Sequence, residues 1–245
     1  MVWQAILQAV VRRERQKAGN ILIVTGQAMK RHNLKMDKLP TVRRLPDYLS
    51  LLQELSASGE IFTTSSYLAE KMGILPILVR KDIELLRITG TPRVGYPIEL
   101  FIKRIENFLG WGASLDAFLF GAGQIGTSIL ANSELMTLGL RIVAAFDNDP
   151  RKIMTSVYGV PVFDSAQLEE QLSRNHVGMA ILCVPSRYAQ SVTDKLVASG
   201  IRGIWNFTSA RLTVPDDVII QKEALTPGYA VLSARLTRMQ SLEYR

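Results

Sequence analysis

The stretch FLFGAGQIGTSIL, residues 118–130, is typical of a strand that runs into a glycine turn and then a helix. Its glycines, Gly121, Gly123 and Gly126, form the pattern GxGxxG. In this pattern the first glycine permits a tight turn, the second lets the backbone approach a pyrophosphate, and the third allows close helix–strand packing. The N–H groups that begin such a helix bind anions. The stretch predicts a dinucleotide-binding turn; the alternative is a glycine turn that only closes a packed corner.

An acidic residue stands at the expected distance from this turn. The segment RIVAAFDND, residues 141–149, indicates a second strand that ends near Asp147. An acid about 20 residues beyond the glycines accepts hydrogen bonds from the adenosine ribose in such domains. Because no basic residue adjoins Asp147 in the sequence, the pattern favours NAD(H) over NADP(H). The expected cofactor-binding residues are Gly121, Ala122, Gly123, Gln124, Ile125, Gly126, Asp147, Asn148, Val184, Pro185 and Asn206.

Strands and helices alternate from residue 115 onward. The expected strands are AFLFGAG, RIVAAFDND, GVPVF, VGMAILCVP, GIRGIWNF and VIIQKE. The expected helices between them are QIGTSILANSELMTLG, SAQLEEQLSRN and SRYAQSVTDKLVASG. This alternation is typical of a doubly wound parallel sheet. Residues 111–228 are therefore expected to form a Rossmann-type α/β domain.

Residues 39–110 are predicted to form a winged helix-turn-helix. The first helix places Leu45, Tyr48, Leu49, Leu52 and Leu55 at helical spacing and ends near Gly59. A second helix, TSSYLAEKMG, has Ser/Thr caps at its start and glycine at its end, and LPILVRKDIELLRITG forms a third. TPRVGYPIE has the turn chemistry of a small hairpin, LFIKRIENFLGW is amphipathic, and GWGAS is a hinge.

The third helix carries Arg80 and Lys81, which are expected to read DNA. In a helix-turn-helix the second helix of the motif enters the major groove, and arginine can bond guanine through two hydrogen bonds. Hydroxyl groups at the start of the preceding helix can bind phosphate. The expected DNA-binding residues are Arg43, Ser65, Ser66, Arg80, Lys81, Arg93 and Tyr96, with Arg93 at the tip of the hairpin. The alternative is a solvated basic face on a small helical domain.

Composition describes a soluble globular chain of 245 residues, 47% hydrophobic and 21% charged, with no apolar run near the ~20 residues that span a bilayer. Its arginines follow the first apolar segment, the reverse of a secretory signal, so a cytoplasmic protein is expected. Residues 1–38 contain 8 Lys/Arg and 2 Asp/Glu, whereas residues 39–110 are nearly neutral. The prediction of DNA binding therefore rests on pattern. Residues 1–38 are interpreted as an appended leader, or as the product of a start mis-assigned upstream of Met36.

The two halves together resemble one family, the bacterial redox-sensing transcriptional repressors called Rex. The resemblance covers residues 40 to about 240, on RLPDYLSLLQELSASG, SSYLAEKMG, VRKDI, VGYPIELF, GAGQIG, AAFDNDPRKI, GVPVF and VPSRYAQSVTDKLVASGIRGIWNFTSARLTVP. It implies a homodimer in which a C-terminal helix, within residues 229–245 and matched by GYAVLSARLTRM, is exchanged between subunits. It also implies that operator DNA is bound when NADH is scarce and released when NADH binds.

This chain departs from the pattern of the family that it resembles at three positions. The family's switch uses an arginine, a tyrosine and an acid, and this chain has Ser50, Asn132 and Ala224 at the matching positions. We therefore expect nucleotide binding to be kept and its coupling to DNA affinity to be weaker. Arg43, Arg44 and Arg211 are the residues through which another route could compensate.

Catalysis is poorly supported by the sequence. A nicotinamide dehydrogenase needs a positioned acid or base, and the histidines are His32, in the leader, and His176, in a polar loop. Cys183, the single cysteine, is interpreted as a small apolar residue at a strand end and not as a reactive thiol. The sequence thus predicts a nucleotide that is sensed rather than used. Two alternatives stay open: the same fold with another nucleotide or coenzyme effector, and an NAD(P)-dependent oxidoreductase with a helical dimerisation domain.

Overall fold

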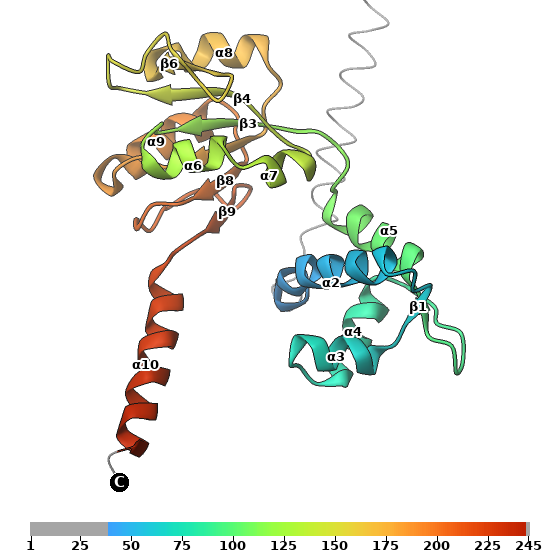
Figure 1. Cartoon of the computed structure of the whole chain (residues 1–245). Helices are drawn as coiled ribbons and strands as arrows, with labels where there is room; N and C mark the ends of the chain where they lie inside the picture. The colour runs from blue at the N-terminus through green and yellow to red at the C-terminus, as the bar shows by residue number, and fades with distance from the viewer. Residues whose placement is uncertain (1–38, 244–245) are drawn as a thin grey trace, which may run out of the picture. The chain divides into compact units, whose positions relative to one another are not determined.

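The computed structural model describes residues 39–243, with side chains to residue 240. The chain divides into two compact units between Leu109 and Gly110 (Figure 1). The expectations for residues 1–38, including those for His32, lie outside the described residues. No helix in the described part is long and apolar enough to cross a bilayer.

The N-terminal unit is a winged helix-turn-helix, as the sequence predicts. Its elements are α2 (Leu39–Ala57), β1 (Phe62–Thr63), α3 (Ser65–Met72), α4 (Pro76–Leu85), β2 (Tyr96–Pro97) and α5 (Ile98–Leu109). The sheet of the wing differs from the local hairpin that was expected, because β2 pairs antiparallel with β1, which precedes α3. At the tip of the wing, residues close in sequence do pair, through an antiparallel bridge between Thr91 and Gly95.

The helix α3 begins and ends at residues that cap it. Thr64 caps α3, since its hydroxyl accepts the N–H of Tyr67, and Gly73 ends it in the left-handed conformation at φ 63°. The first helix, α2, begins at Leu39, earlier than its apolar spacing indicates, and continues through Pro46. Its buried face, Leu45, Tyr48, Leu49 and Leu52, packs in a core with Phe101 and Ile105 of α5.

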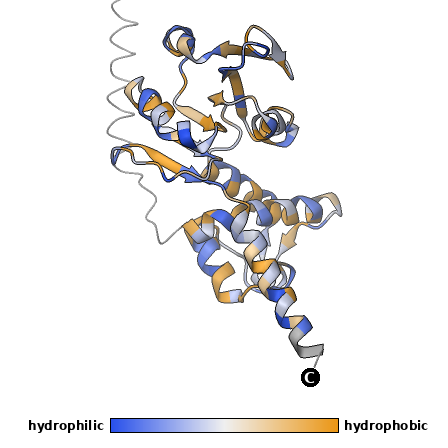
Figure 2. Ribbon diagram, turned by 90° about the vertical axis from the view of Figure 1, so that its left-hand side faces the viewer, coloured by the Kyte–Doolittle hydropathy of each residue, from blue (hydrophilic) through white to orange (hydrophobic). Residues whose placement is uncertain are grey.

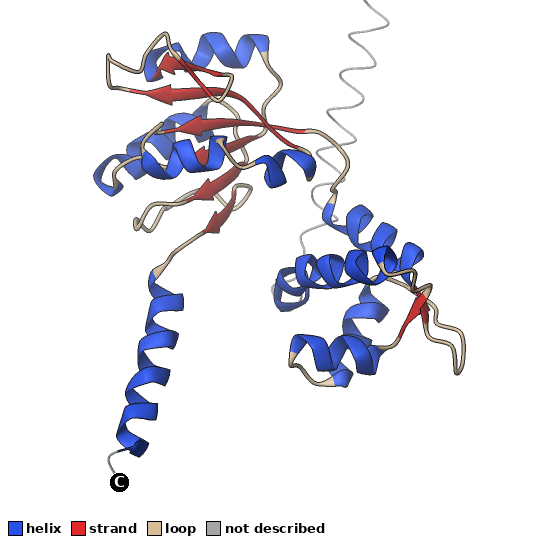
Figure 3. Ribbon diagram, viewed as in Figure 1, coloured by secondary structure: helices blue, strands red, loops and turns tan. Residues whose placement is uncertain are grey.

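The C-terminal unit is a seven-stranded sheet with helices on both faces (Figure 3). Its strands are β3 (Leu115–Phe120), β4 (Leu140–Asp147), β5 (Ser156–Val157), β6 (Val160–Asp164), β7 (Met179–Leu182), β8 (Gly203–Asn206) and β9 (Ile219–Lys222). Its helices are α6 (Gln124–Leu130), α7 (Ser133–Thr137), the 3-10 helix η2 (Ser165–Gln167), α8 (Leu168–Arg174), α9 (Ser186–Ala198) and α10 (Thr226–Glu243).

The spatial order of the strands is β5-β6-β4-β3-β7-β8-β9, and every pair except β5 with β6 is parallel. All six predicted strands are present, and the doubly wound sheet is confirmed. Two details were not predicted: the short strand β5, and the division of one expected helix into α6 and α7. Asn132 causes that division, because its side chain caps α7 by accepting the N–H of Leu135.

The two faces of the sheet follow from the alternation of side chains along its strands. Phe118 of β3 and Phe146 of β4 pack with α8 and α9 on one face, whereas Leu119 and Ile181 pack with α6 on the other. Phe146 also stacks on Phe120, with ring centroids 4.7 Å apart. Figure 2 shows the hydrophobic residues of the sheet strands. Burial of both faces explains why these strands read as apolar runs.

The last helix, α10, contributes no side chain to this core. Its described residues are exposed apart from one that is half-buried, and polar and hydrophobic residues are interspersed along it (Figure 2). The apolar side chains among them are 49–72% exposed: Tyr229, Val231, Leu232, Leu236 and Met239. A single helix that exposes this much apolar surface is typical of an interface.

Candidate dinucleotide and DNA sites

The predicted dinucleotide turn lies where the order of the strands reverses. From β3 the chain adds β4 on one side of the sheet and later β7 on the other, so the loops after β3 and β7 lie side by side. The N–H of Cys183 donates to the carbonyl of Phe120 (2.7 Å), and that of Gly121 donates to Phe146 (2.8 Å). Such a reversal is where doubly wound sheets bind their ligands, outside the carboxyl ends of the strands.

The three glycines of the turn face three different constraints. Gly121 has φ +94°, and a Cβ there would lie 2.7 Å from the carbonyl oxygen of Cys183. A Cβ on Gly126 would overlap the carbonyl oxygen of Gly121, so the contact between α6 and β3 requires glycine. A Cβ on Gly123 would meet no atom within 4 Å outside its chain neighbours, and the backbone there is extended. The fold thus explains two of the glycines, and the open approach to Gly123 fits a ligand.

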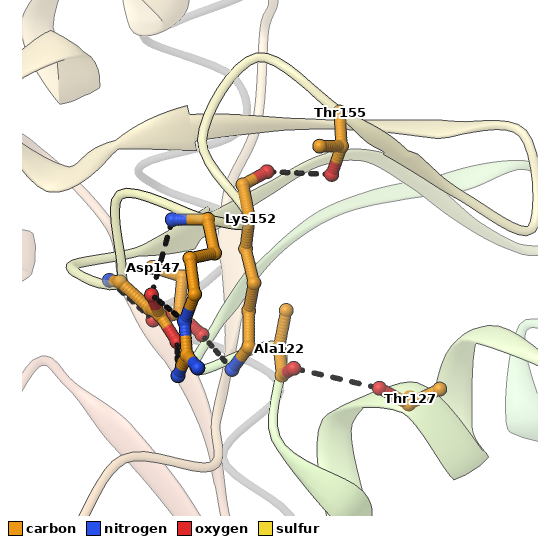
Figure 4. A network of polar contacts seen from close by, with 7 residues as sticks. Ala122, Thr127, Asp147, Lys152 and Thr155 are labelled. Carbon is orange, nitrogen blue, oxygen red and sulfur yellow. Dashed lines mark hydrogen bonds and ion pairs between the residues drawn. The ribbon is translucent and has the colours of Figure 1, made fainter.

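Asp147 ends β4 at the same edge, and a basic group does lie beside it. Its Oδ1 accepts the N–H of Asp149 (2.9 Å), and its Oδ2 accepts Lys152 Nζ (3.0 Å; Figure 4). The expectation that Asp147 lacks a basic neighbour is therefore wrong. The turn at Asp149 and Pro150 brings Lys152 back to the strand end, which its distance along the sequence conceals. The preference for NAD(H) over NADP(H) loses this part of its support.

The other expected cofactor residues surround the same strand ends. Ile125 is 47% exposed at the start of α6, and the carbonyl of Ala122 accepts the hydroxyl of Thr127 (3.5 Å; Figure 4). The amide oxygen of Asn148 accepts the hydroxyl of Ser165 (2.6 Å). Asn206 is buried, and its amide group bonds Thr208 and Ala210 of its own loop. Of the remaining members, Gln124 is exposed at the first position of α6, and Val184 and Pro185 are half-buried and exposed directly after β7.

Residues that could act in catalysis are sparse at this edge. Burial raises the pKa of the Cys183 thiol to about 12, so the thiol stays protonated at neutral pH. His176 is exposed in the loop before β7, at the opposite end of that strand. Among the described residues, no group of three or more His, Cys, Asp or Glu could hold a metal ion.

The helix α4 exposes the residues that were expected to read DNA. Arg80 and Lys81 are exposed, whereas Val79 and Ile83 of the same helix are buried. Ser66 is exposed at the start of α3, as is Arg43 on α2, while Ser65 is half-buried. Arg93 is exposed at the tip of the wing in the left-handed conformation (φ 63°), and the half-buried Tyr96 packs its ring edge-on against Phe101. Contact of these residues with DNA stays a prediction.

Sequence reasoning missed a buried polar cluster that joins α4 to α2, which we call the Asp82 cluster: Thr41, Arg44, Tyr48 and Asp82. Asp82 is 1% exposed. Its Oδ1 accepts Thr41 Oγ1 (2.7 Å) and Arg44 Nη2 (2.7 Å), and its Oδ2 accepts Arg44 Nε (2.8 Å) and the hydroxyl of Tyr48 (2.9 Å). In the sequence, Asp82 resembles any solvated charge on a helix. Only its periodicity with Val79 and Leu86, on the buried face, could have indicated burial.

Burial and hydrogen bonding act in opposite directions on Asp82. Burial raises the pKa of Asp82. The hydrogen bonds from Arg44, Thr41 and Tyr48, together with the charge of Arg44, lower this pKa by more than burial raises it, so the net shift is downward. Burial and the carboxylate raise the pKa of Tyr48. The cluster is therefore a carboxylate held by a guanidinium and two hydroxyls at neutral pH.

The three positions that depart from the family's switch are Ser50, Asn132 and Ala224. The side chains of Ser50 and Asn132 bond neighbouring backbone groups, and that of Ala224 has no polar group. The hydroxyl of Ser50 donates to the carbonyl of Pro46 (3.2 Å), and Asn132 caps α7. Ala224 is exposed between β9 and α10. Of the arginines considered as substitutes, Arg44 is bound to Asp82, whereas Arg43 and Arg211 are exposed.

Two family models match the chain, one for each unit. Residues 39–84 match a putative DNA-binding protein N-terminus, and residues 114–210 match a CoA binding domain. The chain is 43% identical over 202 residues to the redox-sensing transcriptional repressor Rex of Treponema denticola, which covers 82% of this chain and 96% of that protein. The Rex protein of Porphyromonas gingivalis is 40% identical over 203 residues, 83% of this chain and 92% of its own.

Solved structures of a Rex-family repressor are also similar to this chain. RSP, a Rex-family repressor in complex with β-NAD⁺ and operator DNA, is 31% identical, with a TM-score of 0.77, covering 84% of this chain and 95% of its own. RSP in complex with β-NADH has a TM-score of 0.76 at 31% identity, covering 84% of this chain and 97% of its own.

Proposed function

The chain belongs to the Rex family of redox-sensing transcriptional repressors, and we propose that it represses transcription by binding operator DNA as a homodimer whose affinity follows the NADH/NAD⁺ balance. The observation that carries this proposal is the glycine turn at the strand reversal. Its middle glycine faces open space, and a ribose-type acid lies on the next strand. The related repressor RSP is known in one structure with β-NAD⁺ and operator DNA and in another with β-NADH.

In this proposal the cofactor lies across the carboxyl ends of β3, β4 and β7. The N–H groups at the start of α6 bind the pyrophosphate, with Gly123 giving the backbone its close approach. Asp147 accepts the adenosine ribose hydroxyls, because each carboxylate oxygen can accept more than one hydrogen bond. Val184 and Pro185, directly after β7, border the nicotinamide half of the dinucleotide.

In the same proposal α4 enters the major groove and the wing approaches the neighbouring groove. Arg80 is assigned to a base edge, Lys81 and Ser66 to phosphate, and Arg93 to the groove next to the wing. The exposed apolar side chains of α10 support a second copy of the chain as partner. A two-fold dimer of such units should prefer an inverted repeat, with half-sites one or two helical turns apart.

We propose that the nucleotide acts as an effector and not as a reactant. Hydride transfer to a substrate needs an acid or base beside the nicotinamide. Of the described residues that could serve, His176 lies at the far end of β7 and Cys183 keeps its proton. The relatives are repressors by name, which supports the same conclusion.

A second effector class has its own support. Lys152 neutralises Asp147, so a phosphate on the adenosine ribose would meet less repulsion there than at an isolated acid. The match to a CoA binding domain over residues 114–210 points the same way. Coenzyme A and NADP(H) both carry such a phosphate and are the rivals to NAD(H).

The test is to titrate the full-length protein with NADH, NAD⁺, NADPH and coenzyme A, with and without a duplex selected by the protein from random sequence. We expect NADH to bind most tightly and to weaken DNA binding, and the Arg80→Ala, Lys81→Ala double variant to lose DNA affinity with a shallower salt dependence. Tighter binding of coenzyme A or NADPH would replace the proposed effector. DNA binding that is unchanged in the double variant would refute the assignment of α4.

A further inference from the structure

Among the described residues, the Asp82 cluster is the one set of side-chain hydrogen bonds that joins α4 to α2. The other buried side chains of α4 are Val79 and Ile83, whose apolar contacts have no preferred angle about the helix axis. In contrast, Asp82 accepts four hydrogen bonds of 2.7–2.9 Å from Thr41, Arg44 and Tyr48, spread over both carboxylate oxygens. Arg44 presents two nitrogens to the carboxylate in the planar fork that fixes orientation as well as distance.

The position of Asp82 couples that fixed angle to the side chains expected to read DNA. Asp82 directly follows Arg80 and Lys81 on one rigid helix, and its side chain leaves that helix about 100° from Lys81 and about 160° from Arg80, on the buried side. An extended arginine places its guanidinium roughly 9 Å from the helix axis, and a 15° rotation would move it by about 2 Å. Hydrogen bonds to a base edge tolerate only about 0.5 Å. Loss of the angular constraint would therefore disturb base contacts before it disturbed apolar packing.

Stability alone is a weak explanation for such a cluster. A buried ion pair contributes little net stability, since the cost of desolvating both charges offsets their attraction, and apolar side chains of similar volume often replace it without loss. Its documented use is to fix one arrangement among several of similar energy. The early start of α2 agrees with this, because Thr41 and Arg44 belong to the turns of α2 that precede its predicted apolar face.

We propose that Tyr48, Arg44 and Thr41 act through Asp82 as positioning residues that set the rotation of α4, and hence the base selectivity of the repressor. The inference rests on the proposed function, in that α4 must be the helix that reads DNA. It assigns no DNA contact to the four residues themselves. Under this inference, affinity for a selected DNA sequence depends on the rotation of α4 about its axis. Affinity for any duplex depends only on charge.

The test uses Tyr48→Phe and Thr41→Val, each of which removes one hydrogen bond to Asp82 and keeps the side-chain volume. Tyr158→Phe, an exposed tyrosine of the C-terminal unit, is the matched control. Affinities are measured over a range of salt for a duplex selected by the parent protein and for its scrambled counterpart. We expect each cluster variant to lose about tenfold in affinity for the selected duplex, with scrambled-duplex affinity, salt slope and NADH affinity unchanged.

Every other outcome overturns the inference. An unchanged ratio between the two duplexes, accompanied by a lower unfolding midpoint, would make the cluster purely structural. Equal losses on both duplexes with a shallower salt slope would make these residues phosphate contacts. A parent protein that selects no duplex would overturn the inference together with the proposed function, whereas a selective parent with unaffected variants would overturn the inference alone.

Discussion

Gly123→Val is expected to abolish dinucleotide binding in a protein that stays folded. A Cβ at this position meets no atom within 4 Å, and the backbone there, at φ −83° and ψ −162°, is open to any L residue. The expected cost to the fold is the poorer helix cap, about 1 kcal/mol. The side chain would, however, occupy the approach to the N–H groups of α6. Loss of two hydrogen bonds to a charged pyrophosphate, at about 1.5–3 kcal/mol each, lowers affinity by roughly a hundredfold or more.

The measurement is calorimetric titration with NADH, together with urea unfolding followed by circular dichroism. Gly178→Val is the matched control, because Gly178 also has open space around its Cβ position but precedes β7, at the opposite end of the strand. Gly126→Ala provides the contrast, since its Cβ would overlap the carbonyl of Gly121 and should unfold the turn. NADH affinity that is unchanged in folded Gly123→Val would refute the placement of the pyrophosphate. An equal loss in Gly178→Val would show that affinity reports only general destabilisation.

Three further outcomes are expected. Lys152→Met should weaken NADPH binding more than NADH binding, by about tenfold in ratio, because it leaves the carboxylate of Asp147 unneutralised beside the 2′-phosphate; competitive titration measures this, and an unchanged ratio contradicts it. Saturating NADH should change operator affinity by less than about tenfold, since Ser50 and Ala224 stand where the family's switch has a charged arginine and acid; a hundredfold change would show a switch through other residues. The pKa of Asp82 is lower in the folded state than its unfolded value of about 3.9. Its contribution to stability is therefore complete above about pH 4 and is lost as pH falls through the folded pKa. The free energy of unfolding should fall more steeply below about pH 4 for the parent than for Asp82→Asn. Parallel dependences on pH in the two proteins would contradict the lowered pKa of Asp82.

Local chemistry made much of this fold predictable from the sequence. The glycines at 121 and 126 are required by backbone contacts that recur wherever a strand turns into a packed helix, so their spacing carries the prediction. Gly73 ends α3 because only a residue without a Cβ adopts its conformation at low cost. The parallel strands are buried on both faces, and they stand out as continuous apolar runs.

The parts that the sequence concealed depend on partners far along the chain. Asp82 is bonded to residues 34–41 positions away, and apart from its spacing with Val79 and Leu86 nothing near it in the sequence indicates burial of a charge. Lys152 reaches Asp147 only through the shape of the turn between them. The strand β5 has two residues, too few for a pattern, and exists because β6 offers it an antiparallel partner.

Cys183, the single cysteine of the chain, lies at the end of β7 with a thiol pKa of about 12. Peroxide attacks the thiolate, and burial keeps this thiol protonated at neutral pH. The repressor would consequently keep its response to the supply of reducing equivalents during an oxidative burst, when regulators built on reactive cysteines change state.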